Sequence, residues 1–199
     1  MIRLLLGKGG TRAEGEVALL EALLRARFPV QLASVAPPDL LGVLQALERT
    51  LPGGVSVESV TLPATLLRAY EQTSYEVVLG SGRVALRPGV STAGSEALQA
   101  DGFVLLTACN PFSQLVSDEL NAQRLAALRA ALPTGLPLLP AFNVGDDPSW
   151  PTEPGFLVCG LADETALALG RRFGQNAILR CGREGPPSVV PCFPSGPTA

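Results

Sequence analysis

Two stretches of the chain, 107–124 and 150–177, carry the polar side chains that are best suited to chemistry. Each combines amide or hydroxyl groups with a charged residue, a mixture that can bind small polar or anionic molecules and, through a carboxylate, can move protons. Glu153 is therefore the candidate catalytic acid or base. The candidate binding residues are Thr107, Asn110, Ser117, Asn121, Arg124, Trp150, Glu153, Gln175 and Asn176.

The chain contains no histidine. Ser-His-Asp catalysis, Cys-His catalysis and any zinc site with a histidine ligand are therefore excluded. General acid–base chemistry would fall to Asp, Glu, Cys, Tyr or the only lysine, Lys8. The sequence indicates no cofactor and no set of metal ligands, and it leaves open whether the protein is an enzyme.

The composition bounds the size, the compartment and the partners of the protein. A chain of 199 residues with 47% hydrophobic content predicts one domain, or one domain with a small appendage. Four scattered cysteines, no signal-peptide pattern and no apolar run of about 20 residues predict a cytoplasmic protein with reduced thiols and no membrane partner. The net charge of -3 argues against nucleic acid as a partner, and the oligomeric state stays open.

The first 62 residues predict a small βαβαβ segment. Strands are expected at 2–6, 30–35 and 55–60, where apolar residues cluster or alternate. Thr11-Arg12-Ala13-Glu14 fits a capping box that would open a helix, and Pro37-Pro38-Asp39 would begin a second helix. Strands that alternate with helices favour a parallel sheet, either as its own lobe or joined to the later sheet.

Residues 63–193 predict an α+β domain, followed by a flexible tail at 194–199. The apolar run 103–107 is typical of a strand buried on both faces, and Ser117 is a good cap for the next helix. Pro137 and Pro140 favour a sheet edge for the strand that contains them. The other expected elements are a helix at 66–70, a hairpin of 75–79 with 83–87, a helical turn at 96–98, strands at 136–144, 156–161, 177–181 and 189–190, and a helix capped by Asp163.

From 103 to 181 the expected order is strand, helix, strand, strand, helix, strand, which is the split βαβ pattern of a ferredoxin-like sheet. In that pattern the first two strands run parallel and the third lies antiparallel between them. The segments 107–110, 117–121, 145–154 and 175–176 would then meet at one end of the sheet. The sequence thus predicts an α/β (α+β) fold with a polar cluster at the Asn110 and Gln175 end.

The helix after Ser117 provides an independent indication of this cluster. Its four leucines at 120, 125, 128 and 132 span an arc of about 140°, and Asn121 and Arg124 fall inside that arc. A buried guanidinium needs partners, and we expect Glu153 to pair with Arg124. The cluster is either a structural network that fixes the hairpin to the helix or a pocket with Trp150 as its lid.

Three smaller features have a structural interpretation beside a functional one. Lys8, Gly9 and Gly10 lie between an expected strand and an expected helix, where they could bind phosphate or form a plain turn. Cys109 has no obvious base nearby, which favours a buried small residue. Asp146-Asp147 could join Glu153 around a cation, but paired acids before a proline in a hairpin are typical of turns.

The same residues carry a resemblance to a known family. The motifs are Tyr70-x-x-Thr73-x-Tyr75, Thr107-Ala108-x-Asn110-Pro111, Ser117, Asn121, Trp150, Glu153, Gln175 and Ala177. Over roughly 66–190 the chain resembles the bacterial family catalogued as domain of unknown function 3293, whose members have a similar series. The family has no activity to transfer, so the resemblance implies where a site lies and leaves its chemistry open.

Three functions from different classes remain. The first is a ligand-binding domain whose pocket at the Asn110 and Gln175 end holds a small polar or anionic molecule. The second is an enzyme in which Glu153 is the general acid or base, with Arg124 and Asn110 stabilising negative charge. The third is a module that binds a protein partner through an apolar face around Leu40 and Leu44.

Overall fold

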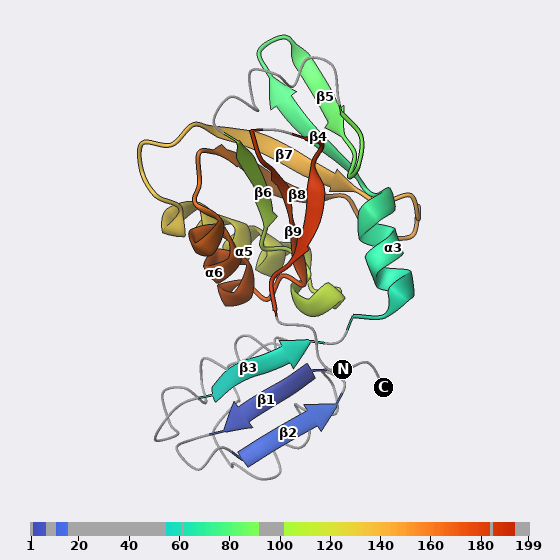
Figure 1. The fold of residues 1–199 in the computed structure, drawn as a ribbon, viewed down its shortest axis with the longest axis vertical. Helices are drawn as coiled ribbons and strands as arrows, with labels where there is room; N and C mark the ends of the chain where they lie inside the picture. Colours follow the sequence, from blue (N-terminus) through green and yellow to red (C-terminus); the bar gives the residue numbers. More distant parts are fainter. Residues whose placement is uncertain are drawn as a thin grey trace.

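The computed structural model describes residues 2–6, 11–15, 55–60, 62–91, 102–183 and 185–193, the first three ranges by their backbone alone. The described residues form a mixed α+β structure with two antiparallel sheets and three α-helices (Figure 1). The predicted strand at 30–35, the helix at Pro37, the apolar face around Leu40 and Leu44, the turn at 96–98 and the tail at 194–199 lie outside these residues.

The N-terminal sheet is antiparallel, with β1 (Ile2–Leu6) between β2 (Thr11–Gly15) and β3 (Val55–Val60). Leu6 pairs with Thr11 on one side and with Val55 on the other. The predicted helix at Thr11 and the predicted parallel sheet are therefore wrong. A capping box is a signal of only four residues, and here the backbone after Thr11 pairs with β1 instead of continuing as a helix.

The second sheet has seven strands in the order β10-β9-β6-β8-β7-β4-β5, and each neighbouring pair is antiparallel. It curls, and its two ends approach each other: the N–H of Gly89, just after β5, donates to the carbonyl of Pro187, just before β10, at 2.8 Å. β8 lies between β6 and β7 and is antiparallel to both, so β6 and β7 run in the same direction. The strands are β4 (Ser74–Leu79), β5 (Gly82–Leu86), β6 (Phe103–Thr107), β7 (Leu138–Val144), β8 (Glu153–Cys159), β9 (Ala177–Cys181) and β10 (Ser188–Pro191).

β7 lies inside this sheet, between β8 and β4, although its prolines predicted an edge position. β4 pairs with β7 only from Ala141 to Val144, so Pro140 precedes the stretch with partners on both sides. The missing N–H of Pro140 therefore removes no hydrogen bond to β4. The edge prediction is wrong because a proline is disfavoured only in the part of a strand that has partners on both sides, and Pro140 lies just outside that part.

The two faces of the seven-stranded sheet are covered differently. α5 (Asp118–Ala131) and α6 (Asp163–Arg172) pack on one face, where Leu128 meets Val104 and Leu106 of β6. Leu105 faces the other side, which α3 (Ala64–Gln72) approaches at one end (Figure 1). All five residues of β6 are buried, which confirms the prediction of a strand covered on both faces.

Both helices on the covered face begin with acidic residues, but only one of them has a side-chain cap. Ser117 caps α5 as predicted, since its Oγ accepts a hydrogen bond from the N–H of Leu120 at 3.3 Å. Asp163 does not cap α6, because it is already the first residue of the helix, and its carboxylate accepts from Nε of Arg180 at 2.6 Å. Ala162 takes the cap position without a side-chain bond.

The orientation of α5 agrees with its sequence pattern. Arg124 and Leu128 are buried and Asn121 is half-buried, while Gln123 and Arg129 are exposed. The predicted inward face is thus confirmed, and the polar residues that it carries lie at the end of β6.

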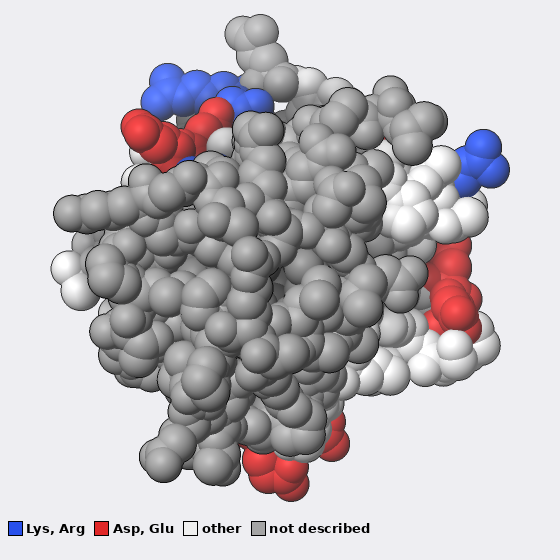
Figure 2. All heavy atoms as spheres, turned by 90° about the horizontal axis from the view of Figure 1, so that it is seen from below, with Lys and Arg blue, Asp and Glu red and all other residues white. Residues whose placement is uncertain are grey.

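Charged side chains in the described part of the chain are scattered. On the face drawn in Figure 2, the described arginines and acids lie in small separate groups at the margin. No described helix combines the length and the apolar composition needed to cross a membrane.

Candidate functional site

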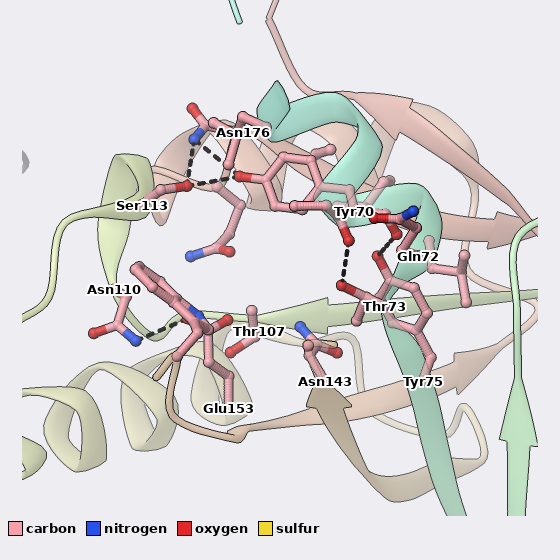
Figure 3. Close-up of a pocket in the computed structure, with 18 of the residues that line it drawn as sticks. Tyr70, Gln72, Thr73, Tyr75, Thr107, Asn110, Ser113, Asn143, Glu153 and Asn176 are labelled. Carbon is pink, nitrogen blue, oxygen red and sulfur yellow. Dashed lines mark hydrogen bonds between the residues drawn. The ribbon is translucent and has the colours of Figure 1, made fainter. Parts of the chain in front are cut away.

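A cavity of about 250 Å³ opens on the face of the seven-stranded sheet that α5 and α6 leave free. α3 forms one wall, and the ends of β6, β7, β8 and β9 near Asn110 form the others (Figure 3). Ser117, Asn121 and Arg124 are not among the residues that line it. The other candidate binding residues do line it, namely Thr107, Asn110, Trp150, Glu153, Gln175 and Asn176.

Glu153 is the first residue of β8, and strand pairing decides where its carboxylate points. It is paired with Asn143 of β7, which is in turn paired with Tyr75 of β4. Directly opposed residues in antiparallel strands project from the same face, so all three side chains reach the cavity. Oε1 of Glu153 accepts a hydrogen bond from Nδ2 of Asn110 at 2.8 Å (Figure 3) and another from Nε1 of Trp150 at 3.2 Å.

The environment of Glu153 shifts the pKa of its carboxyl group upward. Burial raises the pKa of this carboxyl, and the hydrogen bonds from Asn110, Trp150 and Asn143 only partly offset the effect by stabilising the carboxylate. An acid with a raised pKa in a cavity is the combination found at many functional sites.

Arg124 does not have the partner that the sequence predicted for it. Its Nε donates to the carbonyl of Ala108 at 2.7 Å and its second guanidinium nitrogen donates to the carbonyl of Phe173 at 2.6 Å. Glu153 receives its bonds from amides and an indole. The predicted ion pair between Arg124 and Glu153 does not form, because α5 places Arg124 on the side of the loop after β6 that faces away from the cavity. Glu153 lies on the cavity side of that loop.

This loop, residues 108–113, is strained. Asn110, Phe112 and Ser113 have φ values of 44°, 52° and 56°, in the left-handed region that side chains rarely adopt. Each such residue costs about 1–3 kcal/mol and persists only where its surroundings hold it. Strain of this kind is concentrated at sites where the position of a few atoms matters.

Asn121 holds the first of these strained residues from behind. Its Oδ1 accepts from the backbone N–H of Asn110 at 2.9 Å, and its Nδ2 donates to Oδ1 of Asn110 at 3.1 Å. Oδ1 of Asn110 also accepts a hydrogen bond from the backbone N–H of Val116 at 3.2 Å. The Asn110 amide is therefore oriented so that its Nδ2 points to Glu153.

The turn after α6 holds the rest of the loop. The N–H of Phe112 donates to the carbonyl of Gly174 at 2.7 Å, and Nε2 of Gln175 donates to the carbonyl of Cys109 at 2.9 Å. Gly174 has a φ of +66°, and a Cβ there would lie 2.9 Å from the Phe112 ring. Glycine is therefore required for both the backbone conformation and the close approach.

A second cluster of polar groups lies on the opposite side of the cavity from Glu153 (Figure 3). The hydroxyls of Tyr70 and Ser113 are 2.7 Å apart, and Nδ2 of Asn176 donates to both oxygens, at 3.1 Å and 3.0 Å. The hydroxyl of Tyr75 donates to the carbonyl of Tyr70 at 3.1 Å. Burial raises the pKa of both tyrosines, so they remain protonated donors.

The lining residues that were not among the predicted site residues include Tyr70, Tyr75, Ser113 and Asn143. Both tyrosines belong to a motif of the family resemblance, and that motif was the signal that could have indicated them. Asn143 is a polar residue near the end of a mostly apolar strand, a weaker signal of the same kind. Nothing in the sequence around Ser113 marks it.

Two of the remaining candidates have structural roles. Oγ1 of Thr107 donates to the carbonyl of Pro154 at 2.7 Å and accepts from the N–H of Cys109 at 3.1 Å, so it joins β6 to β8. Cys109 is 1% exposed, and burial raises the pKa of its thiol. It is a buried small residue, as its sequence context favoured.

The acidic pair in the β7–β8 hairpin is at least partly a turn former. Oδ1 of Asp147 accepts from the N–H and from the hydroxyl of Ser149, at 2.8 Å and 2.7 Å. Within the described residues, no group of three or more Cys, Asp or Glu side chains is arranged to hold a metal ion. Lys8, Gly9 and Gly10 lie outside the described residues.

Comparison with known proteins agrees with the resemblance. A family model with the description "Protein of unknown function (DUF3293)" matches residues 106–178, which run from the end of β6 into β9. Asn110, Glu153 and Gln175 fall inside this segment, whereas Tyr70 on α3 falls outside it. No curated protein and no solved structure matches the chain.

Proposed function

We propose that the cavity between α3 and the end of the seven-stranded sheet is a binding site for a small polar molecule. The observation that carries this proposal is the convergence of polar side chains from α3, the 108–113 loop, β7, β8 and the turn after α6 on a space of about 250 Å³. A concave space with a few oriented polar groups is the usual form of a small-molecule site.

The strained loop supports the same proposal. Asn110 and Ser113 both adopt left-handed backbone conformations, and both project side chains into the cavity wall. A relaxed loop would be expected if the role of these residues were only to close the fold. Strain that is held by Asn121, Gly174 and Gln175 is consistent with a requirement for defined side-chain positions.

A thermal-unfolding screen tests the proposal. Amino acids, amines, nucleosides, sugars and hydroxy acids are added to the wild-type protein, and a ligand at about 100 times its Kd should stabilise the fold by about 2.7 kcal/mol. Glu153→Gln and Tyr70→Phe should reduce the shift, whereas Glu164→Gln, on the exposed side of α6, should leave it unchanged. The proposal is wrong if no compound stabilises the wild type, or if the cavity variants keep the full shift.

Catalysis by Glu153 is a second candidate function, favoured by one observation. The carboxyl group lies in a cavity with a raised pKa, and a general acid or base works best when its pKa approaches the working pH. Asn110 is close enough to assist, but Arg124 does not line the cavity and would have no direct part. Incubation of a stabilising compound with wild type and Glu153→Gln tests this, since turnover by the wild type alone supports catalysis and recovery of unchanged compound from both contradicts it.

We also propose that residues 103–181 form a ferredoxin-like unit, extended by the β4–β5 hairpin at one edge and by β10 at the other. The order β9-β6-β8-β7 and the position of α5 and α6 on one face support this. An experimental structure with a different strand order would contradict it.

A further inference from the structure

Among the described residues that line the cavity, the charged side chains are all acidic, namely Asp146, Asp147 and Glu153. Asp147 is engaged by Ser149, and Asp146 lies 3.7 Å from the guanidinium of Arg87. Glu153 is the enclosed one of the three, whereas both Asp side chains are exposed, and an anionic ligand beside it would meet no compensating cation among the described lining residues.

Hydrogen-bond donors surround Glu153, and one of its neighbours carries an acceptor without a partner. Asn110 and Trp150 both bond to Oε1, which leaves the second carboxylate oxygen to the cross-strand amide of Asn143 and to the cavity. Oδ1 of Asn143 is the one side-chain atom in the described part of the chain that is buried without a hydrogen-bond partner. An unsatisfied buried acceptor costs about 1–3 kcal/mol. Because the Asn143 amide donates to Glu153, its Oδ1 lies on the far side, and only a flip of the amide would bring this oxygen to an N–H group bound at Glu153.

The polar cluster on the opposite side of the cavity has one hydroxyl hydrogen that no bond within the cluster uses. Asn176 uses both hydrogens of its amide on the oxygens of Tyr70 and Ser113, and one of these two hydroxyls donates to the other. Two hydroxyls carry two hydrogens, so one O–H remains. This cluster can therefore donate one hydrogen bond to an acceptor on a ligand.

Building on the proposed function, we infer that the ligand is a small amine or amidine that also carries a hydroxyl or carbonyl group. The cationic nitrogen binds at Glu153, and the hydroxyl or carbonyl oxygen accepts from the Tyr70–Ser113 pair. Tyr70, Tyr75 and Trp150 also line the space, and aromatic faces attract cations.

Matched probes test this inference by calorimetry. Amino alcohols and amino-acid amides of two to six carbons are compared with hydroxy acids of the same lengths at constant ionic strength. The amines should bind to the wild type and the hydroxy acids should not. Glu153→Gln should weaken amine binding about tenfold and Tyr70→Phe about threefold, because the first variant removes a charge-assisted contact and the second a neutral one. Glu164→Gln should bind as the wild type does.

The outcomes separate this inference from the proposed function. Binding of hydroxy acids but not of amines, sensitive to Glu153→Gln, would overturn the ligand class and keep the site. Amine binding that ignores both cavity variants would overturn the inferred contacts. No binding by any compound of the wider screen would overturn the proposed function itself.

Discussion

The loop at 108–113 has polar side chains on both of its sides, and the two sets form different kinds of hydrogen bond. Behind the loop, Arg124 donates to main-chain carbonyls and Asn121 holds Asn110. In front of it, Glu153 and the Tyr70 cluster bond to other side chains around an open space. Side chains that satisfy a backbone hold its shape, whereas side chains that satisfy one another around a space keep the capacity to bind another molecule.

The comparison also divides the motif series that first drew attention to this end of the sheet. Asn121 and Asn110 both belong to that series, yet only Asn110 reaches the cavity. A series of similar positions can therefore mix residues that shape a loop with residues that would contact a ligand. Substitutions on each side of the loop should separate the two roles.

The largest effect is expected behind the loop, from Arg124→Met. The change removes charge-assisted bonds to two carbonyls, those of Ala108 and Phe173, and should lower the free energy of unfolding by about 3 kcal/mol. Arg68→Met on the exposed face of α3 is the matched control and should change it by less than about 0.5 kcal/mol. Denaturant titration of both variants decides the matter, and equal losses would show that the buried guanidinium has no special role.

Asn121→Leu should have the next largest effect. Leucine suits the inward face of α5 but leaves the N–H and the side chain of Asn110 without this partner, at a cost of about 1–3 kcal/mol. Gln123→Leu, on the exposed face of the same helix, should cost less than about 0.5 kcal/mol. A larger loss at Gln123 than at Asn121 in the same denaturant titration would show that α5 is oriented the other way.

A smaller loss is expected in front of the loop, from Tyr70→Phe. The variant removes one hydroxyl from the cluster with Ser113 and Asn176, and a neutral hydrogen bond contributes about 1 kcal/mol. Because Ser113 and Asn176 still bond to each other, the expected loss of unfolding free energy is near that value. A loss as large as that of Arg124→Met would mean that the front of the loop is as structural as the back.

The smallest effect is a change in how stability depends on pH. Burial raises the folded-state pKa of Glu153 above the ordinary value of 4.5. The contribution of this carboxyl group to the unfolding free energy is therefore fully present below pH 4.5, and it is lost as the pH rises through the folded-state pKa. The unfolding free energy of the wild type minus that of Glu153→Gln should therefore decrease with rising pH and then level off. Denaturant titrations over a pH series measure this difference, and a flat or increasing difference would contradict the raised pKa.

Much of the fold around the site could be predicted because its signals are local. The apolar run of β6, the cap at Ser117 and the apolar arc of α5 each lie within a few residues, and the structure confirms all three. The capping box at Thr11 is equally local but failed, because pairing with β1 competes with helix formation there. Local patterns decide an element only where no distant partner offers the backbone another set of hydrogen bonds.

The partners of the polar residues could not be predicted in the same way. Burial of Arg124 follows from its place on α5, but its bonds to Ala108 and Phe173 depend on how the loop and α6 pack. The sequence offered Glu153 as an equally reasonable partner by charge alone. A shift of a few ångströms decides between a carbonyl and a carboxylate, and periodicity carries no information at that scale.

The sequence by itself determined that polar residues from separate segments gather at the Asn110 end of a sheet, since strand order and helix faces follow from hydrophobic patterns. Only the tertiary structure decided which of them surround a cavity. Tyr70 meets Ser113 and Asn176 across 43 and 106 residues of chain, because α3 carries it to the cavity that they also line. Contacts over such separations depend on the whole arrangement of packed elements, and no local pattern encodes them.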